Sequence, residues 1–563
     1  FEELLPMNLL NKFLNRTEFE SYEDFYKNYS LKYDDDFNFG FDVVDEYAKI
    51  CPEKRALVWC DDEGREKIIN YGELSRYTNK TANYFKSLGI KKGDMVMLIL
   101  KRHYEFWYSI IALHKLGAVT IPATHLLTKK DIIYRCNSAK IKLIVCAEDD
   151  NVTKHIEESL SETPTVKAVV IDRGEKKGWE SFEKGVEEAS DVFERPEGLE
   201  KTSVSDTMLL YFTSGTTGNP KMVCHNFAYP LGHIPTAAYW HNVSDDGLHL
   251  TVADTGWGKA VWGKLYGQMI AGTGIFIYDY SSRFEPSDLL KMVEKYKITT
   301  FCAPPTIYRF FIKADLTKFD LSSLKHCTTA GEALNPEVYK KFLEATGLKL
   351  YEGFGQTESC LSLATYKWET PHTGSMGKPS PYYKAFLIND EGEVCDPGQT
   401  GEIVFDMSEG TPIGVFKGYL YDEEKTKEVL DGKYYHTGDL AWCDEDGFYW
   451  YVGRVDDVIK SSGYRIGPFE VESALMEHPA VFETAITAVP DEIRGQVVKA
   501  TIVLAKGYTP SDELVKELQN HVKRTTAPYK YPRIIEFADE LPKTISGKIR
   551  RVELREKDVK KQK

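Results

Sequence analysis

The hydrophobic positions in the first two-thirds of the chain fall into short, nearly uninterrupted runs. These runs occupy residues 95–100, 141–146, 166–171, 208–212 and 274–278. Strands that are buried on both faces of a parallel sheet have this pattern. Between the runs, residues 71–88 and 286–296 repeat apolar side chains at helical spacing, which indicates amphipathic helices. This alternation predicts an α/β fold with mixed, mainly parallel sheets and helices.

The pattern changes after about Asp439. Residues 434–442 and 448–453 read as two strands of a hairpin, joined by a turn at 444–447. Shorter elements then follow: a helix at 468–477, strands at 484–489 and 497–504, and a helix at 511–523. We therefore predict a large N-terminal domain, residues 1–454, and a small mobile α+β domain, residues 455–563. The charged end, residues 556–563, is expected to be frayed.

Composition narrows the functional classes. With 563 residues the chain is too long for one hydrophobic core, in agreement with two domains. A net charge of -15 argues against a general nucleic-acid surface, and the longest apolar runs are far short of a membrane span. No secretory signal is visible in residues 1–15. The ten cysteines form no CxxC pair or Cys/His cluster, so we expect inert thiols and a cytoplasmic location.

A segment rich in hydroxyl groups and glycine follows the strand predicted at 208–212. It consists of Thr213, Ser214, Gly215, Thr216, Thr217 and Gly218. Such a segment wraps backbone N–H and side-chain O–H donors around phosphate oxygens, and the nearby Lys221 adds a compensating charge. It is not a Walker A loop, because Pro220 precedes Lys221 and Met222 follows it. The alternative is a flexible turn without a ligand.

This loop resembles the signature loop of the adenylate-forming superfamily, which includes acyl-CoA synthetases, firefly luciferase and peptide-synthetase adenylation domains. Further segments similar to that family's motifs follow in the family's order, from residue 209 to residue 551. Residues 254–257, 262–264 and 526–532 are most similar to the medium-chain acyl-CoA synthetases. The resemblance implies an ATP-dependent acid:CoA ligase with ATP, Mg²⁺ and coenzyme A as its substrates and cofactors.

The resemblance also implies which residues bind the nucleotide. Two segments supply the positions Gly331, Glu332, Ala333, Glu352, Gly353, Phe354, Gly355 and Gln356. At the end of the second segment, Thr357 would meet the α-phosphate and Glu358 would hold the magnesium ion, which prefers hard oxygen ligands. Asp439 would accept hydrogen bonds from the ribose hydroxyls. Taken alone, Glu358 would be a surface acid and Asp439 part of a turn.

The C-terminal motifs imply a second set of roles. Arg454 would contact the ribose, Asp456 would be the hinge between the domains, and Arg465 would approach the α-phosphate. Lys548 matches the family's catalytic lysine, a fixed charge between the carboxylate and the α-phosphate. The implied CoA-binding residues are Ser462, Gly463, Tyr464, Arg494 and Lys523. For Lys523, a solvated helix end is an equal alternative.

One glycine indicates the size of the acid. Acetyl-CoA synthetases carry a tryptophan directly before Gln-Thr-Glu, and this chain has Gly355 there. The smaller residue predicts an acyl pocket for medium-chain, branched or aryl carboxylic acids, with Trp257 and Val261 as candidate walls. A neighbouring side chain that refills the space would instead give a short-chain enzyme for acetate or propionate.

Other functions remain open at this point. A luciferase-like oxygenase would share every motif, whereas a peptide-synthetase module would continue into a carrier domain. A phosphotransferase, from a different class, would release ADP in place of AMP. The sequence does not decide between a monomer and a homodimer.

Overall fold

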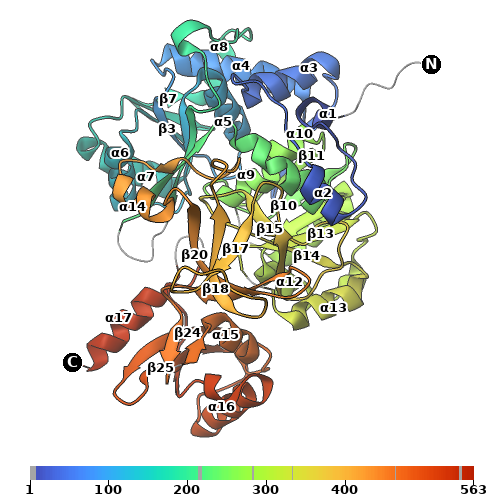
Figure 1. Ribbon diagram of the computed structural model, residues 1–563. Helices are drawn as coiled ribbons and strands as arrows, with labels where there is room; N and C mark the ends of the chain where they lie inside the picture. Colours follow the sequence, from blue (N-terminus) through green and yellow to red (C-terminus); the bar gives the residue numbers. More distant parts are fainter. Residues whose placement is uncertain are drawn as a thin grey trace.

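The computed structural model describes residues 8–213, 219–281, 285–332, 334–462, 464–543 and 548–562. These residues form a large N-terminal body and a small C-terminal unit, which lies below the body in Figure 1. The predicted α/β class, with sheets covered by helices and a smaller α+β unit at the C-terminus, is confirmed.

The largest sheet crosses the N-terminal body and ends near the C-terminal unit. Among the described residues it has thirteen strands, and those in its middle, from β1 to β14, run parallel. In spatial order these are β17 (Ala385–Ile388), β18 (Thr400–Asp406), β20 (Tyr434–Cys443), β21 (Tyr449–Arg454), β16 (Ser375–Pro379), β15 (Leu361–Ala364), β14 (Leu350–Gly355), β13 (His326–Ala330), β12 (Thr300–Ala303), β10 (Leu248–Thr251), β11 (Gly274–Asp279), β1 (Arg55–Asp61) and β2 (Glu66–Asn70).

A second sheet of the body has eight strands in the described part of the chain. It consists of β19 (Gly418–Tyr419), β9 (Lys221–Asn226), β8 (Thr207–Thr213), β4 (Val119–Pro122), β3 (Met95–Ile99), β5 (Leu143–Ala147), β6 (Ala168–Asp172) and β7 (Glu180–Ser181). From β8 to β7 the neighbouring strands are parallel. Ligands of open α/β sheets bind outside the carboxyl ends of such strands.

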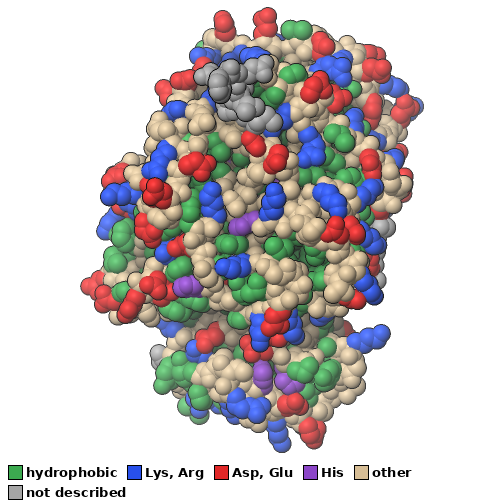
Figure 2. All heavy atoms as spheres, turned by 90° about the vertical axis from the view of Figure 1, so that its right-hand side faces the viewer, with side chains coloured by type: hydrophobic (Ala, Val, Ile, Leu, Met, Phe, Trp, Pro, Cys, Tyr) green, Lys and Arg blue, Asp and Glu red, His purple; other side chains and the backbone are tan. Residues whose placement is uncertain are grey.

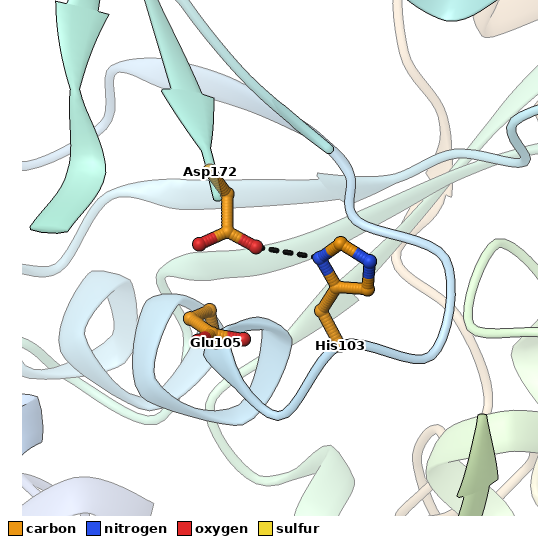
Figure 3. Close-up of side chains that lie close together, drawn as sticks. All are labelled: His103, Glu105 and Asp172. Carbon is orange, nitrogen blue, oxygen red and sulfur yellow. Dashed lines mark hydrogen bonds and ion pairs between the residues drawn. The ribbon is translucent and has the colours of Figure 1, made fainter. Parts of the chain in front are cut away.

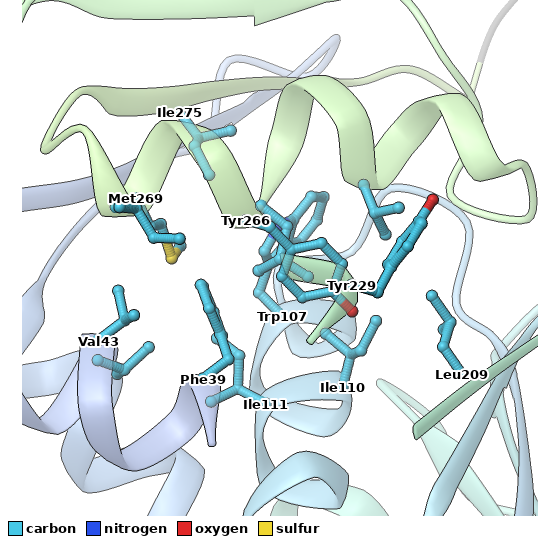
Figure 4. Close-up of a cluster of buried hydrophobic side chains, with 14 of the residues drawn as sticks. Phe39, Val43, Trp107, Ile110, Ile111, Leu209, Tyr229, Tyr266, Met269 and Ile275 are labelled. Atoms are coloured by element: carbon cyan, nitrogen blue, oxygen red, sulfur yellow. The ribbon is translucent and has the colours of Figure 1, made fainter. Parts of the chain in front are cut away.

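The two sheets share one core, and α5 (Glu105–Leu116) lies inside it. Every residue of this helix is buried. Trp107, Ile110 and Ile111 of α5 face Tyr266 and its neighbours, with Leu209 from β8 on one side and Ile275 from β11 on the other (Figure 4). The other main helices of the body are α4 (Tyr71–Ser87), α6 (Lys129–Ala139), α7 (Asp150–Ser159), α9 (Gly258–Lys264), α10 (Tyr266–Ile270), α11 (Pro286–Tyr296), α12 (Pro305–Phe311), α13 (Pro336–Thr346) and α14 (Glu423–Val429).

The C-terminal unit has its own sheet and its own core. Its strands are β23 (Tyr464–Ile466), β22 (Ile459–Ser461), β25 (Gly495–Leu504), β24 (Val481–Asp491) and β26 (Ile534–Phe537). Two helices, α15 (Pro468–Met476) and α16 (Asp512–Thr525), pack apolar side chains such as Val471 and Leu518 against this sheet. This separate core is what a small, independently packed unit requires.

The prediction of a frayed C-terminal end is wrong. Residues Arg551–Gln562 form helix α17. Leu554 packs against Leu541 and Ala485, and the carboxylate of Asp558, one turn further on, pairs with Lys499 of β25. The sequence did not reveal these two inward-facing positions, because most of their neighbours in the segment are charged. The buried partner of Asp558, Lys499, is visible only in the folded chain.

The pattern-based elements agree closely with the structure. Helix α11 has the predicted bounds, and β3, β8, β11 and β25 differ from their predictions by one or two residues at an end. None of the described helices is long and apolar enough to cross a membrane. Lys and Arg side chains are interspersed with Asp and Glu over the face shown in Figure 2.

Candidate active site

The end of β14 and the loop after it form one wall of the site. Glu352 is buried there and accepts hydrogen bonds from the backbone N–H groups of Gly374, at 2.7 Å, and Leu334, at 3.3 Å. Burial raises the pKa of Glu352 to about 8, against the opposing effect of these two hydrogen bonds. The side chain thus ties β14 to two neighbouring loops, which positions the residues that follow it.

Gln356 and Asp439, which are 83 residues apart in the sequence, are in contact. The Nε2 group of Gln356 donates to the carbonyl oxygen of Thr437 at 2.8 Å and to the carboxylate of Asp439. Tyr451 donates its hydroxyl to Asp439 Oδ1 at 3.2 Å, and Arg454 lies 3.4 Å from Oδ2. The predicted nucleotide residues Gln356, Asp439 and Arg454 therefore form one cluster. Tyr451 completes it and was not predicted.

The glycine between Thr437 and Asp439 has a steric reason. Gly438 adopts φ +68°, and a Cβ atom there would lie 2.6 Å from the guanidinium of Arg454. Arg454 also donates to the carbonyl of Thr437 at 2.9 Å. Because strands β20 and β21 pair Asp439 with Arg454, the glycine lets the arginine fold back over the turn.

Thr357 and Glu358 are held from the second sheet. His225 of β9 donates from Nε2 to the carbonyl oxygen of Thr357 at 2.6 Å; burial lowers the pKa of His225 to about 4, so this ring is neutral. Tyr419 donates its hydroxyl to Glu358 Oε1 at 3.0 Å. The ammonium group of Lys221 lies 5.1 Å from the centre of the Tyr419 ring.

Lys221 joins this group through the hairpin that carries the phosphate loop. Its partner across β8 and β9 is Thr213, so the two predicted residues flank the loop at its base. Burial lowers the pKa of Lys221, and the nearby charge of Glu358 acts in the opposite direction. The remaining predicted residues of the loop, Ser214, Gly215, Thr216, Thr217 and Gly218, lie outside the described residues, as do Ala333 and Gly463.

The predicted adenine turn follows β13. Gly331 has φ +102°, and Glu332 accepts a hydrogen bond from Thr306 Oγ1 at 3.1 Å. Lys259, near the start of α9, donates to the carbonyl oxygen of Ala330 at 2.7 Å. Burial lowers the pKa of Lys259. We did not predict Lys259 as a site residue from the sequence, although a charged residue within the apolar segment after Trp257 could have indicated a functional position.

Lys548 reaches the site from the C-terminal unit. Burial raises the pKa of Asp439, whereas the charges of Arg454 and, more weakly, Lys548 lower it. The charge of Lys548 also acts on Lys259. A charge acts appreciably only over a short range, so Lys548 lies near the cluster around Asp439.

The other C-terminal residues that were predicted for the site contact residues outside the cluster around Asp439 in this structure. Arg465 forms an ion pair with Asp390, in the turn after β17, and this pair links the C-terminal unit to the body. Arg494 donates to Ser462 Oγ at 3.1 Å, Tyr464 stacks on Tyr529, and Lys523 lies over the Tyr531 ring. Tyr464 is half exposed, so this group faces solvent.

The space beside Gly355 is partly filled. A Cβ atom on Gly355 would lie 2.3 Å from Trp262 Cη2 and 2.5 Å from the carbonyl oxygen of Cys360. Trp262, on α9, is buried and donates from Nε1 to the hydroxyl of Tyr229 at 3.3 Å. The sequence named Trp257 and Val261 as walls but missed Trp262, whose position depends on how α9 crosses β14.

A separate group of side chains has the composition of a metal site. Among the described residues, only His103, Glu105 and Asp172 gather three possible ligand atoms, all within 4.8 Å of one another (Figure 3). His103 Nδ1 lies 2.6 Å from Asp172 Oδ2. The guanidinium of Arg173 lies 2.8 Å from Glu105 and 3.9 Å from Asp172. Because this cation already lies within ion-pair distance of both carboxyl groups, we assign no metal to the group.

Two family profiles cover most of the chain. The profile described as AMP-binding enzyme matches residues 44–420, and that of the AMP-binding enzyme C-terminal domain matches residues 470–548. This chain belongs to the AMP-binding enzyme family. The match includes β8, β14 and the turn after β13, and the second profile ends on Lys548.

The relatives are acyl-CoA synthetases over nearly the whole chain. The chain is 40% identical to human acyl-coenzyme A synthetase ACSM3, mitochondrial, over 560 residues, which cover 97% of this chain and 94% of that protein. It is 41% identical to human ACSM4, with 93% and 90% covered. The solved anthranilate CoA ligase AuaEII, in complex with anthranoyl-AMP, matches with a TM-score of 0.85 and 28% identity over 93% of this chain and 98% of that one.

These comparisons confirm the predicted activity. The chain is an acyl-CoA synthetase, an acid–thiol ligase that works through an acyl-adenylate and takes ATP and coenzyme A as substrates. The predicted cytoplasmic location is contradicted, because the relatives that match over nearly the whole chain are mitochondrial enzymes.

Proposed function

We propose that this enzyme activates medium-chain, branched or aryl carboxylic acids, in the pocket bounded by Gly355, Trp257, Val261 and Trp262. Support comes from Gly355, where acetyl-CoA synthetases carry an indole, and from the similarity to AuaEII, an anthranilate CoA ligase and thus an enzyme for an aryl acid. Trp262 occupies part of the space and limits the length of a linear chain. A short-chain acid is the second candidate, favoured by that same contact.

We assign the nucleotide to the cluster around Asp439. The carboxylate of Asp439 suits a vicinal diol, and Arg454 is its neighbour on β21. Thr357, Glu358, Lys221 and the loop 213–218 would surround the phosphates. One contact supports this assignment. His225 of β9, the strand paired with β8, binds the carbonyl oxygen of Thr357, which follows β14, so the three strands come together there.

The chain offers a fitting ligand for magnesium. Glu358 presents a carboxylate whose Oε1 is already fixed by Tyr419, near the ammonium group of Lys221. Hard carboxylate oxygens, few in number, are what Mg²⁺ takes from proteins. When bound, the ion would neutralise charge on the triphosphate. Glu358 would hold it, and Lys221 would contribute a second positive charge.

Lys548 carries the adenylation step in this proposal. The acid's carboxylate attacks the α-phosphorus in line, and pyrophosphate leaves; a fixed ammonium between the two anions offsets their repulsion. The assignment rests on the resemblance of Lys548 to the family's catalytic lysine, and it is supported by the nearness of this lysine to buried Asp439, whose pKa its charge lowers. Thr357, which follows Gln356 of the same cluster, would hold the α-phosphate oxygens.

The second step would require a different placement of the C-terminal unit. We place the domain boundary after Arg454, the last residue of β21, and the hinge at Asp456. Asp457, next to the hinge, is buried and held by Arg555 at 2.6 Å and Arg551 at 3.7 Å, both from α17. Asp456 thus lies between two anchored residues. A rotation there would bring the exposed group of Ser462, Tyr464 and Arg494 to the site.

A panel of acids tests the acyl class. We would measure AMP release with CoA for linear acids from acetate to decanoate, for branched acids and for benzoate. The proposal predicts the highest kcat/KM for an acid larger than acetate, and a decline for the longest linear chains. A maximum at acetate or propionate would refute the larger pocket and establish the short-chain alternative.

A further inference from the structure

The loop after β4 packs directly against residues 254–257, the segment that includes the candidate acyl-pocket wall Trp257. A Cβ atom on Gly256 would lie 2.4 Å from the backbone nitrogen of Thr124 and 2.6 Å from the carbonyl carbon of Ala123. Backbone therefore contacts backbone here, and any larger residue at 256 would push the two segments apart. The contact fixes the residue that follows Thr124, which is His125, beside the start of residues 254–257.

His125 faces a carboxylate of that segment. Its Nδ1 lies 3.6 Å from Oδ2 of Asp254, too far for a hydrogen bond. Among the described residues this buried Nδ1 has no hydrogen-bond partner, although the side chain is 25% exposed. Asp254 is itself fixed, because its Oδ1 accepts a hydrogen bond from the Gly256 amide at 2.9 Å. The pair is aligned and needs only a small movement to close.

The surroundings keep Asp254 charged. Burial alone would raise its pKa, but the interactions with His125, the Gly256 amide and Arg102 hold the pKa below its usual value. Burial, with help from Arg102, lowers the pKa of Lys264 to about 7. The charged or titratable groups around the pair and its segment are Lys101, Arg102, Asp149, Lys264, Asp279 and Tyr280.

Asp254 belongs to a segment whose other end approaches the predicted reaction centre. At the other end of the same segment, a Cβ atom on Gly258 would lie 3.9 Å from the side chain of Thr357, the residue assigned to the α-phosphate. Asp254 and Gly258 are four positions apart in the chain, so their Cα atoms lie at most about 14 Å from each other. Trp257, between them, is a candidate wall of the acyl pocket.

We propose that His125, oriented by Asp254, accepts the proton of the CoA thiol in the second step. This inference rests on the proposed placement of the acid and nucleotide. The S–H proton passes to Nε2 of His125, and the sulfur forms a bond with the acyl carbon. The bond between that carbon and the phosphate oxygen then breaks, AMP leaves with its electron pair, and His125 returns the proton to water.

A proton acceptor has a clear task in this step. A thiol is mostly protonated at neutral pH, and the thiolate is the nucleophile. Lys548, a cation, serves the first step and cannot accept the proton. Once the pair has closed, the carboxylate accepts the hydrogen bond of an Nδ1–H group, which leaves the lone pair of Nε2 for the thiol. Catalytic hydrogen bonds that are long in a free enzyme often shorten in the complex, as the 3.6 Å contact would.

The test separates the two steps in His125→Gln. The first step is measured as pyrophosphate release without CoA, and the second as acyl-CoA formation from adenylate already bound to the enzyme. We expect an unchanged first step and a second step slowed about 10²-fold at pH 7. The deficit should shrink as pH rises, because the thiol then ionises without help.

His155→Gln is the matched control. His155, on α7, contacts the loop that carries His125: its Nδ1 lies 3.1 Å from the carbonyl oxygen of Leu127. This change should leave both steps unchanged. Asp254→Asn should slow the second step in the same pH-dependent way, although by less.

Three results would overturn the inference. An equal loss in both steps of His125→Gln would mean a structural role. An unchanged second step, or a deficit that is constant with pH, would exclude proton transfer to His125. Absence of pyrophosphate release by the wild type with every acid would instead overturn the proposed function, and this inference with it.

Discussion

Replacing Trp262 with alanine should lengthen the acids that the enzyme accepts. The tip of this indole lies 2.3 Å from the position of a Cβ atom on Gly355, so it fills the space that the glycine would leave. Removing it opens room for about three methylene groups, each of which contributes about 0.8 kcal/mol when buried. The sum of about 2.4 kcal/mol corresponds to roughly a 50-fold shift in kcat/KM towards the longer acids.

The same change carries a stability cost. Trp262 is 7% exposed, and Trp→Ala changes at buried positions lower the free energy of unfolding by about 3–5 kcal/mol. Trp107→Ala, inside α5, is the control, because it removes an equally buried indole from the shared core. It should destabilise the protein by a similar amount without changing the preference for chain length.

The assay compares kcat/KM for hexanoate, octanoate and decanoate with that for butyrate, at 25 °C, in the wild type and both variants. Gly355→Ala should act in the opposite direction, because its methyl group must displace the indole or the Cys360 carbonyl. If Trp262→Ala leaves the ratios unchanged, or shifts them no more than Trp107→Ala does, Trp262 is not a wall of the acyl pocket.

Three further changes test other parts of the account. Lys548→Ala should slow pyrophosphate release by about 10²–10³-fold but spare thioester formation from bound adenylate; equal losses would contradict its assignment to the first step. Asp456→Pro should do the reverse, because proline restricts the backbone at the hinge; unhindered thioester formation would place the hinge elsewhere. Burial raises the pKa of Glu352 from 4.5 to about 8, so the native state holds a proton that the unfolded state releases between these pH values. Stability should therefore fall over this range by up to about 1.4 kcal/mol per pH unit, and chemical denaturation of Glu352→Gln should show this slope removed; an identical slope would mean that Glu352 is charged in the native state.

The fold could be predicted to the extent that local pattern determines it. Helix α11 and strand β11 are periodic on their own and keep their predicted bounds within a residue. Helix α17 was missed because its few inward positions, Leu554 and Asp558, are dispersed among charges. Two of their partners, Ala485 on β24 and Lys499 on β25, lie more than fifty residues away, so no local window contains them.

The residues of the candidate site also fall into those that the sequence indicated and those that it did not. Contiguous motifs brought Thr357, Asp439 and Lys548 to attention, although only the resemblance to a family gave them roles. Trp262, Tyr451 and His125 were missed, because each acts on a neighbour that is distant in sequence. Distances and burial in the folded chain show their importance. For Trp262 the relevant contact is with Gly355, and from the sequence alone we interpreted the missing side chain of that glycine as open space.

The most direct test of the central claim is a measured stoichiometry for the complete reaction. ATP, CoA and a suitable acid are incubated with the enzyme, and pyrophosphate, AMP, ADP and acyl-CoA are quantified together. The account predicts equal amounts of pyrophosphate, AMP and acyl-CoA. Without CoA, it predicts pyrophosphate up to one equivalent of enzyme. Formation of ADP and phosphate, or AMP release that is independent of an acid, would contradict it.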